Sequence, residues 1–160
     1  MQSKTNETTA VLDGLRRIVR VLRESSREAE SKLGVSGAQL FALKALSEAR
    51  QLSLSELAER TRTHQSSVSV VVKRLVRSKL VARKASPEDA RQLELSLTPK
   101  GRALLKRAPN AAQDRLILAV EALPRGERQA LGRVLAHLSE AMGAADTAPQ
   151  MFFEEQRRDA

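Results

Sequence analysis

The feature that most constrains this chain is a short helix, a turn and a second helix, followed by a stretch of alternating apolar and polar residues. Ser53 and Glu56 form a capping box, in which a serine and a glutamate three residues later bond to free amides at a helix start. The helix that they open runs to about Arg60. Thr63 offers a cap for the next helix, which runs to about Ser78. Two short helices joined by three or four residues have the dimensions of a helix-turn-helix, although ordinary helical hairpins share them.

A β-hairpin is predicted directly after the second helix. The turn-rich run 85–90 separates two extended segments, and in the second segment Leu93, Leu95 and Leu97 alternate with polar residues. Because successive side chains of a strand point to opposite faces, these leucines lie on one face. The sequence therefore predicts a two-stranded hairpin with one apolar face.

Helices precede and follow this centre. Apolar residues recur at spacings of three and four in 8–32 and again between about 124 and 143, which indicates two amphipathic helices. Ser36 and Gln39 form a second capping box for a helix that precedes the helix-turn-helix. Another helix is expected over 99–120, and Pro109 should bend or split it because proline removes a backbone donor and clashes with the preceding turn. The segment after about 143 is expected to be a tail with a small apolar anchor at 151–153.

Positive charge is concentrated in the central stretch. The formal net charge is +9, and residues 60–107 hold 13 Lys and Arg residues against three acidic residues, a net of +10. A basic surface confined to one stretch suits DNA, because binding to phosphates releases their counterions. A solvated surface that only keeps the protein soluble is the alternative.

Composition argues against several other classes of protein. The absence of Cys rules out disulfides, thiolate metal sites and cysteine-based redox sensing. Tyr and Trp are also absent, so binding of single strands through stacked bases is disfavoured. No segment approaches the roughly 18 apolar residues that a membrane span requires. We therefore expect a cytoplasmic protein without a membrane contact.

Catalysis and metal binding have little support in the sequence. His64 is expected near the core face of the second helix of the helix-turn-helix. His137 lies in the last helix without an acid or nucleophile at a suggestive spacing. A glycine-rich phosphate loop is missing, and two isolated histidines make a poor metal site. We expect no enzyme, no cofactor and no metal.

The second helix of the helix-turn-helix has the order of residues expected of a recognition helix. On a wheel of about 100° per residue, the core face holds Val68, Val71, Val72 and Leu75. The opposite face holds Ser66, Val70, Lys73 and Arg77, with Ser69 at its edge. Small residues thus come first, where a helix enters the major groove, and cations come later, where the phosphates lie. An ordinary exposed polar face is the alternative.

Individual roles follow from side-chain chemistry. Gln65 is the best candidate for a bidentate contact to adenine, and Val70 could touch a thymine methyl group. Arg62 and Ser53 lie near helix starts, where free amides and the helix dipole favour a phosphate. For Ser53, capping is the simpler role.

A series of short motifs then resembles the MarR family of transcriptional regulators, in order and at compatible spacing. The motifs are Leu54-Ser55-Glu56-Leu57-Ala58, Ser67-Val68-Ser69, Leu75, Leu80-Val81-Ala82-Arg83, Asp89-Ala90-Arg91 and Leu97-Thr98-Pro99-Lys100-Gly101. The likeness covers about 36–105. It implies a mainly α fold with a small β-hairpin wing, a winged helix-turn-helix with N- and C-terminal dimerisation helices.

The resemblance implies one domain over 8–143. Its winged helix-turn-helix spans 36–98, its dimerisation helices span 8–32 and 99–143, and 1–7 and 144–160 are tails. In the family, the arginine of an Asp-x-Arg element near the wing tip enters the minor groove while the aspartate holds the wing. Arg91 and Asp89 match these positions, and a plain surface ion pair between them is the alternative. The expected DNA-binding set is Ser53, Arg62, Thr63, Gln65, Ser66, Ser69, Val70, Lys73, Arg77, Arg83, Lys84, Asp89 and Arg91.

The chain departs from the family pattern at two positions. Ala90 stands where an arginine is frequent, which removes a phosphate or wing-stabilising contact. Lys79 stands where Gly or Asn is usual after the recognition helix. A left-handed lysine there costs roughly 1 kcal/mol, unless the helix ends differently.

A single winged unit covers few base pairs, so a twofold dimer on two half-sites is expected. The predicted dimer contacts are Leu15, Ile18, Leu22, Leu116, Val120, Leu131, Leu135 and Leu138, with an intrachain core as the alternative. Relatives often bind small aromatic effectors in a cleft between dimer helices and winged unit. The expected function is a sequence-specific regulator of double-stranded DNA, a repressor on a palindromic operator that a small-molecule effector could release. The alternative is a nonspecific architectural or protein-docking winged helix.

Overall fold

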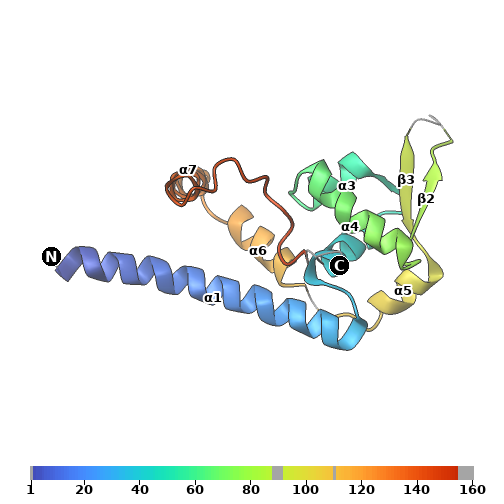
Figure 1. The fold of residues 1–160 in the computed structure, drawn as a ribbon, viewed down its shortest axis with the longest axis horizontal. Coiled ribbons are helices and arrows are strands. Elements are labelled where there is room, and N and C mark those ends of the chain that lie inside the picture. The colour runs from blue at the N-terminus through green and yellow to red at the C-terminus, as the bar shows by residue number, and fades with distance from the viewer. Residues whose placement is uncertain (1, 88–91, 110, 155–160) are drawn as a thin grey trace.

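The computed structural model describes residues 2–87, 92–109 and 111–154. Figure 1 shows a cluster of short helices with a small sheet, from which one long helix extends. The elements in chain order are α1 (Gln2–Leu33), α2 (Gly37–Ser47), β1 (Leu52–Ser53), α3 (Leu54–Arg60), α4 (Gln65–Arg77), β2 (Val81–Ala85), β3 (Leu93–Leu97), α5 (Pro99–Leu105), α6 (Ala112–Glu121) and α7 (Arg125–Ala141).

The core lies between α2, α3, α4 and the sheet. Both predicted capping boxes are present, at the start of α2 and at the start of α3. The wheel drawn for α4 is confirmed, because Val68, Val71 and Leu75 are fully buried. Burial of this apolar stripe fixes the rotation of α4 about its own axis, and thereby fixes which residues face outward.

The sheet has three antiparallel strands in the order β1-β3-β2. The predicted hairpin of β2 and β3 is confirmed, and Leu95 on β3 is buried. A third strand that the sequence did not predict joins this hairpin, because Leu52 and Ser53 pair with Leu95 and Glu94. A strand of two residues has no alternation that a sequence pattern could detect.

The chain turns sharply between α4 and the sheet. Lys79 has φ 59°, so the left-handed conformation expected there is present. The Thr98 amide donates to the Leu80 carbonyl at 3.1 Å, and the Thr98 hydroxyl accepts from the Gly101 amide at 3.0 Å. A Cβ atom on Gly101 would lie 2.2 Å from the Leu80 oxygen. The Thr-Pro-Lys-Gly motif therefore holds α5 against the end of α4, and only glycine fits at its last position.

Helix boundaries confirm some predictions and correct others. The helix expected over 99–120 is split around Pro109 into α5 and α6. The cap assigned to Thr63 is wrong, because α4 starts after His64 and the Thr63 hydroxyl pairs with the Thr61 hydroxyl instead. His64 is exposed ahead of the helix, so its expected place near the core face is also wrong. In the described part of the chain, no helix is long and apolar enough to span a bilayer.

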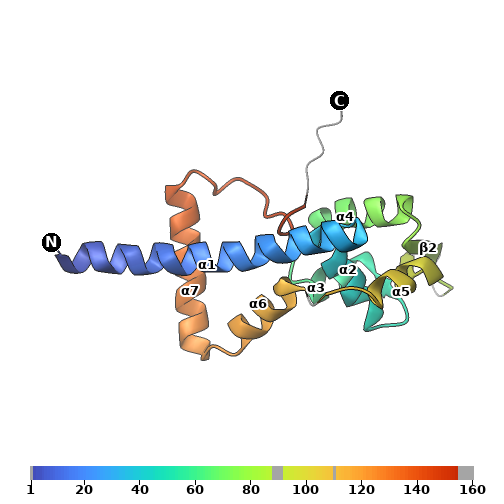
Figure 2. The same cartoon turned by 90° about the horizontal axis from the view of Figure 1, so that it is seen from below.

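The two flanking helices leave the core. Only the C-terminal third of α1 is anchored, where Ser25 accepts from the Ala112 amide and Ser26 from the Gly37 amide, each at 3.1 Å. The rest of α1 extends away from the body, and α7 lies on the same side of the molecule (Figures 1 and 2). No residue of α7 is buried.

The segment after α7 returns to the core (Figure 2). Met151 is 3% exposed and belongs to the central apolar cluster, which confirms the predicted anchor at that residue. Phe152 is half exposed and Phe153 is partly covered, with their ring centroids 6.4 Å apart.

Candidate nucleic-acid interface

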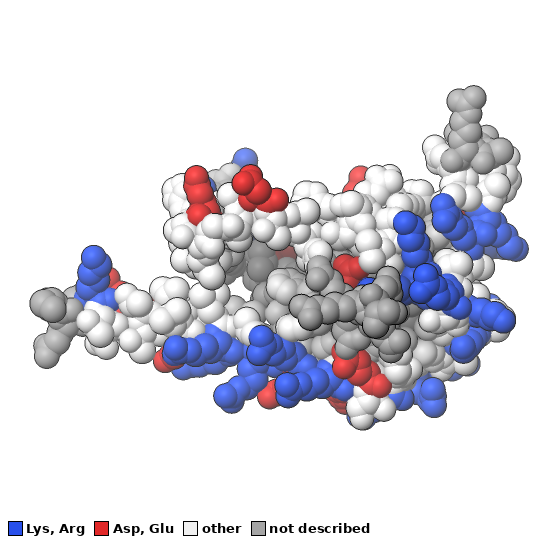
Figure 3. Space-filling view, in the orientation of Figure 1, with Lys and Arg blue, Asp and Glu red and all other residues white. Residues whose placement is uncertain are grey.

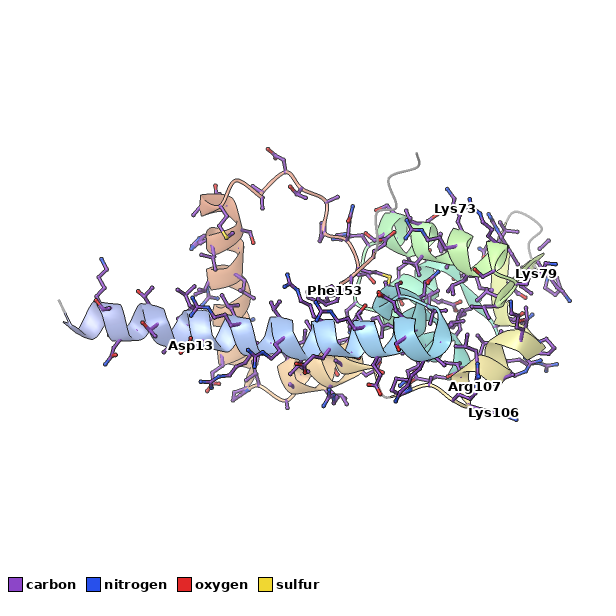
Figure 4. The ribbon with its side chains drawn as sticks, turned by 60° about the horizontal axis from the view of Figure 1, so that its bottom comes forward. Asp13, Lys73, Lys79, Lys106, Arg107 and Phe153 are labelled. Carbon is purple, nitrogen blue, oxygen red and sulfur yellow. The ribbon has the colours of Figure 1, made fainter. Side chains whose placement is uncertain are left out.

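The outward face of α4 carries the residues that the sequence predicts for DNA. Gln65, Ser66, Lys73 and Arg77 are exposed, and Val70 is 42% exposed although it is apolar. An apolar side chain held in solvent on an otherwise amphipathic helix is available for a contact with another molecule. Figure 4 shows Lys73 pointing outward from α4.

A groove of 470 Å³, which we call the wing groove, lies between α3, α4 and the sheet. It brings together five predicted residues from three elements, namely Ser53 of β1, Gln65, Ser69 and Lys73 of α4, and Arg83 of β2. Ser55 lies in the same groove, and its hydroxyl donates to Gln65 Oε1 at 3.4 Å. This bond ties the first residue of α4 to the start of α3.

A second groove of 580 Å³ lies on the other side of α4, toward the end of α1. Val70, Lys73 and Arg77 line it together with Arg74, which sequence reasoning missed. Arg74 lies one turn before Arg77 at the basic end of α4, and this position in the sequence could have identified it. The exposed ridge of α4 thus stands between two grooves.

Exposed cations surround this ridge. Figure 3 shows Lys and Arg side chains gathered over α4, the base of the hairpin and α5. Lys73, Arg77, Arg83 and Lys84 are all exposed, and none lies within 4.0 Å of a carboxylate of the described residues. Exposed cations that no described carboxylate neutralises are what a phosphate backbone requires.

Three predicted residues have other contacts. Arg62 has φ 50° and pairs through Nη2 with Glu121 Oε1 of α6 at 2.9 Å, so it points toward α6. Thr63 is half-buried beside Thr61. The Ser53 hydroxyl accepts from the Glu56 amide at 3.2 Å, which is the capping role. In return the Ser53 amide donates to Glu56 Oε2 at 2.7 Å, and the hydrogen bonds from Ser53 lower the pKa of Glu56.

Asp89 and Arg91, and the Ala90 between them, fall outside the described residues. Their roles in the minor groove and in the wing remain predictions from the sequence.

The predicted dimer contacts divide into three groups. Ile18, Leu131, Leu135 and Leu138 are exposed, whereas Leu22 is 4% exposed and packs within the chain. Leu15, Leu116 and Val120 are half-buried. Further exposed apolar residues that the sequence analysis did not choose extend the same faces: Val11, Leu12, Val19, Leu118, Val134 and Met142.

A cavity of 690 Å³, which we call the α6 cavity, separates α6 from the helix-turn-helix. Its wall is mostly apolar, with Phe41, Leu116, Ile117, Val120 and Met151 among the lining side chains. Charged groups stand at its edge, where Arg62 pairs with Glu121 and Arg128 donates to the Glu121 carbonyl at 3.0 Å. Residues 149–152 close one side.

Neither histidine lies in a constellation that suggests chemistry. His64 and His137 are both exposed. Within 2–87, 92–109 and 111–154, no three His, Cys, Asp or Glu side chains gather into a group that could hold a metal ion.

The fold and the cationic face of α4 define a winged helix-turn-helix module built to contact DNA. A family model described as MarR family matches residues 33–92. The HTH-type transcriptional repressor Mb2911 of Mycobacterium bovis is 37% identical over 94 residues, which cover 59% of this chain and 68% of that protein. The chain belongs to the MarR family, and it is a DNA-binding transcriptional regulator.

Other comparisons agree with this assignment. The HTH-type transcriptional repressor MdtR of Bacillus subtilis is 40% identical over 74 residues, 46% of this chain and 48% of that protein, so the match spans about half of the relative. Sco3205, a MarR family transcriptional regulator from Streptomyces coelicolor solved in complex with DNA, has 25% identity and a TM-score of 0.59 over 85% of this chain and 88% of that chain. In Bordetella bronchiseptica BpsR, 6-hydroxynicotinic acid regulates DNA binding. The structure of BpsR has 26% identity and a TM-score of 0.56 over 83% of this chain and 92% of that chain.

Proposed function

We propose that this chain is a sequence-specific transcriptional repressor that binds a palindromic operator in double-stranded DNA as a homodimer. The outward face of α4 carries the proposal, because it combines small polar residues and an exposed valine with exposed cations at its end. Gln65, Ser66 and Val70 face the bases of the major groove, and Lys73 and Arg77 meet phosphates. This role places the protein in the cytoplasm with its operator.

The wing groove and the hairpin have different roles in this proposal. Lys73 and Arg83 flank the groove from two elements, so a DNA strand that runs along it meets cations on both sides. Arg91, at the tip of the hairpin, enters the neighbouring minor groove in this proposal and Asp89 orients it. Base contacts come from α4, and the hairpin adds affinity and a preference for DNA shape.

A second copy of the chain covers the exposed apolar faces of α1 and α7. Leu131, Leu135 and Leu138 recur at spacings of four and three on α7, which buries none of its residues in one chain. Contiguous apolar faces of this kind mark interfaces. A closed twofold dimer presents two copies of α4, and this geometry matches an operator with two inverted half-sites.

A small molecule in the α6 cavity releases the repressor from DNA. The cavity lies between α6 and the turn that precedes α4, and its mostly apolar wall suits a compact apolar compound. BpsR, which has a similar fold, is the relative whose DNA binding 6-hydroxynicotinic acid regulates. A ligand acts here by favouring one distance between the two recognition helices over another.

Competition binding tests the proposal. The full chain is mixed with its best palindromic site, selected from random DNA, and with a scrambled competitor while the salt concentration is raised. A sequence-specific regulator keeps a preference of at least about 10³-fold for the palindrome at physiological salt. A preference below about tenfold at every salt concentration would show a nonspecific architectural protein instead.

Two substitutions in α4 separate base reading from phosphate binding. Ser66→Ala is expected to relax base preference with a modest loss of affinity. Lys73→Ala is expected to weaken binding to all sequences alike and to reduce the dependence on salt by about one counterion. The opposite pattern would mean that α4 is rotated relative to the DNA.

A further inference from the structure

The tail after α7 makes specific contacts with the recognition helix. The Ser67 hydroxyl, on the first turn of α4, donates to the Pro149 carbonyl at 2.8 Å. Ser67 is buried on the inner side of α4, whereas its neighbour Ser66 faces outward. The tail therefore reaches the recognition helix from behind and leaves its DNA-facing side open.

The same short segment is also bonded to α6. The Gln113 side-chain amide donates to the Phe152 carbonyl at 3.2 Å, and Gln113 itself is buried. Between the two bonds, the Met151 side chain enters the central apolar cluster. Residues 149–152 thus join the helix that reads DNA to the helix that leads into α7.

The local backbone shows that the segment ends in a defined turn. Phe153 has φ 56°, an unfavourable conformation for a bulky residue, and the Glu154 amide donates to the Met151 carbonyl at 3.2 Å. Burial raises the pKa of Glu154, while the nearby Arg74 of α4 opposes this shift. Ser67 and Arg74 are two turns apart on the same face of α4, so both positions at which the tail interacts with the recognition helix lie on that face.

We propose that residues 149–153 are a built-in peptide ligand that latches the recognition helix to α6 in the position required for DNA. The proposal rests on the DNA-binding function proposed above. A tethered peptide needs only modest contacts, because the tether gives it a high local concentration. The latch also forms one wall of the α6 cavity, so a molecule that fills this cavity touches it directly.

Met151→Asp tests the latch, because a charge in place of the buried Met151 side chain opposes docking. In the full chain without DNA, amide hydrogen exchange over 66–70 is expected to accelerate about tenfold. Binding to the selected palindrome is expected to weaken about tenfold, and binding to palindromes with altered half-site spacing is expected to weaken less. Ala145→Asp adds the same charge at an exposed position of the tail outside the docked segment and should change neither quantity.

Ser67→Ala provides a second test that does not disturb the apolar core. It removes one hydrogen bond to the tail, and we expect about threefold faster exchange at the start of α4 and about threefold weaker operator binding. Ser47→Ala, which removes a serine bond to the Lys44 carbonyl at the end of α2, is the matched control.

Unchanged exchange in both Met151→Asp and Ser67→Ala would overturn the latch, and so would tighter operator binding by either variant. Exchange reports on the latch without DNA. A wild-type chain that does not prefer the palindrome would contradict the proposed function while leaving the exchange result to decide the latch.

Discussion

The winged helix-turn-helix, which we call the centre, differs from the flanking helices α1 and α7 in how much of its apolar surface a single chain buries. The largest fully buried side chains all lie in the centre: Leu40, Leu43, Leu46, Leu57, Val68, Val71, Leu75 and Leu95. By contrast, α7 buries none of its residues, and α1 exposes apolar residues over its first two thirds. The centre thus buries its apolar side chains within one chain, whereas the flanking helices leave theirs exposed, and we propose that a second copy covers them.

The largest effect is expected from a substitution in the exposed apolar stripe of α7. Leu135→Asp places a charge in the middle of the exposed stripe of α7, where Leu135 is 43% exposed in one chain. Because a charge buried at an interface without a partner is strongly unfavourable, the dimer should dissociate. Operator affinity should then fall by about 10²-fold or more, because the two half-sites no longer act together.

Analytical ultracentrifugation and operator binding check this prediction. Ala136→Asp is the matched control, since it adds the same charge one residue further along α7, on the far side of the helix from the stripe. Thermal unfolding of the centre should change little in either variant if the centre folds alone. A Leu135→Asp protein that remains dimeric would place the interface elsewhere.

Glycines give a second contrast between the two regions. In Gly101→Ala, the new Cβ atom would meet the Leu80 carbonyl oxygen at 2.2 Å, so the backbone of the centre must shift. We expect a loss of about 2 to 3 kcal/mol in the free energy of unfolding, typical of overpacking. Gly132→Ala lies in the middle of α7, where a new Cβ atom would meet nothing within 4 Å, and it should instead gain up to about 1 kcal/mol from helix propensity.

Urea denaturation of each variant measures both free energies. The contrast fails if Gly101→Ala is as stable as the wild-type protein. Such a result would mean that the join between the end of α4 and α5 adjusts to a methyl group without strain.

A smaller effect is expected at the end of the recognition helix. Lys79 adopts φ 59°, and a glycine there relieves the strain of a left-handed side chain. Lys79→Gly should raise the free energy of unfolding by about 1 kcal/mol. Lys79→Ala removes the same charge but keeps the strain, so it should give no such gain. Equal stability of the two variants would assign the effect to the charge.

Sequence patterns predicted those parts of the molecule that local chemistry determines. Two capping boxes, the buried face of α4 and the split at Pro109 follow from short-range bonds and periodicity, and all are confirmed. Five residues of the predicted DNA-binding set also line the wing groove. The rotation of α4 and the position of the hairpin after it determine that these side chains lie together, and both follow from the sequence pattern.

Contacts between distant segments could not be predicted in this way. The pairing of Leu52 with Leu95, the turn of Arg62 toward Glu121 and the bond from Ser67 to Pro149 join residues 43, 59 and 82 positions apart. No local pattern encodes such contacts, because each of these side chains could equally well interact with residues close to it in the sequence. Leu22 illustrates the same limit, because its place in an amphipathic stripe does not tell intrachain packing from a dimer contact.

The smallest expected effect concerns the pH dependence of the centre. Hydrogen bonds from Ser53 at the start of α3 lower the pKa of Glu56 below the ordinary value of a glutamate. A carboxylate whose pKa is lower in the folded state contributes stability above its ordinary pKa, and this contribution is lost as the pH falls through the folded value. Glu56→Gln keeps an oxygen for the capping bond but cannot titrate, so the stability difference between wild type and variant should shrink on acidification below about pH 4.5. Urea midpoints at a series of pH values measure it, and Glu59→Gln on the same helix, away from the capping box, should not reproduce it. A constant difference across the acid range would show that the capping carboxylate does not couple to folding, even though its geometry is that of a complete capping box.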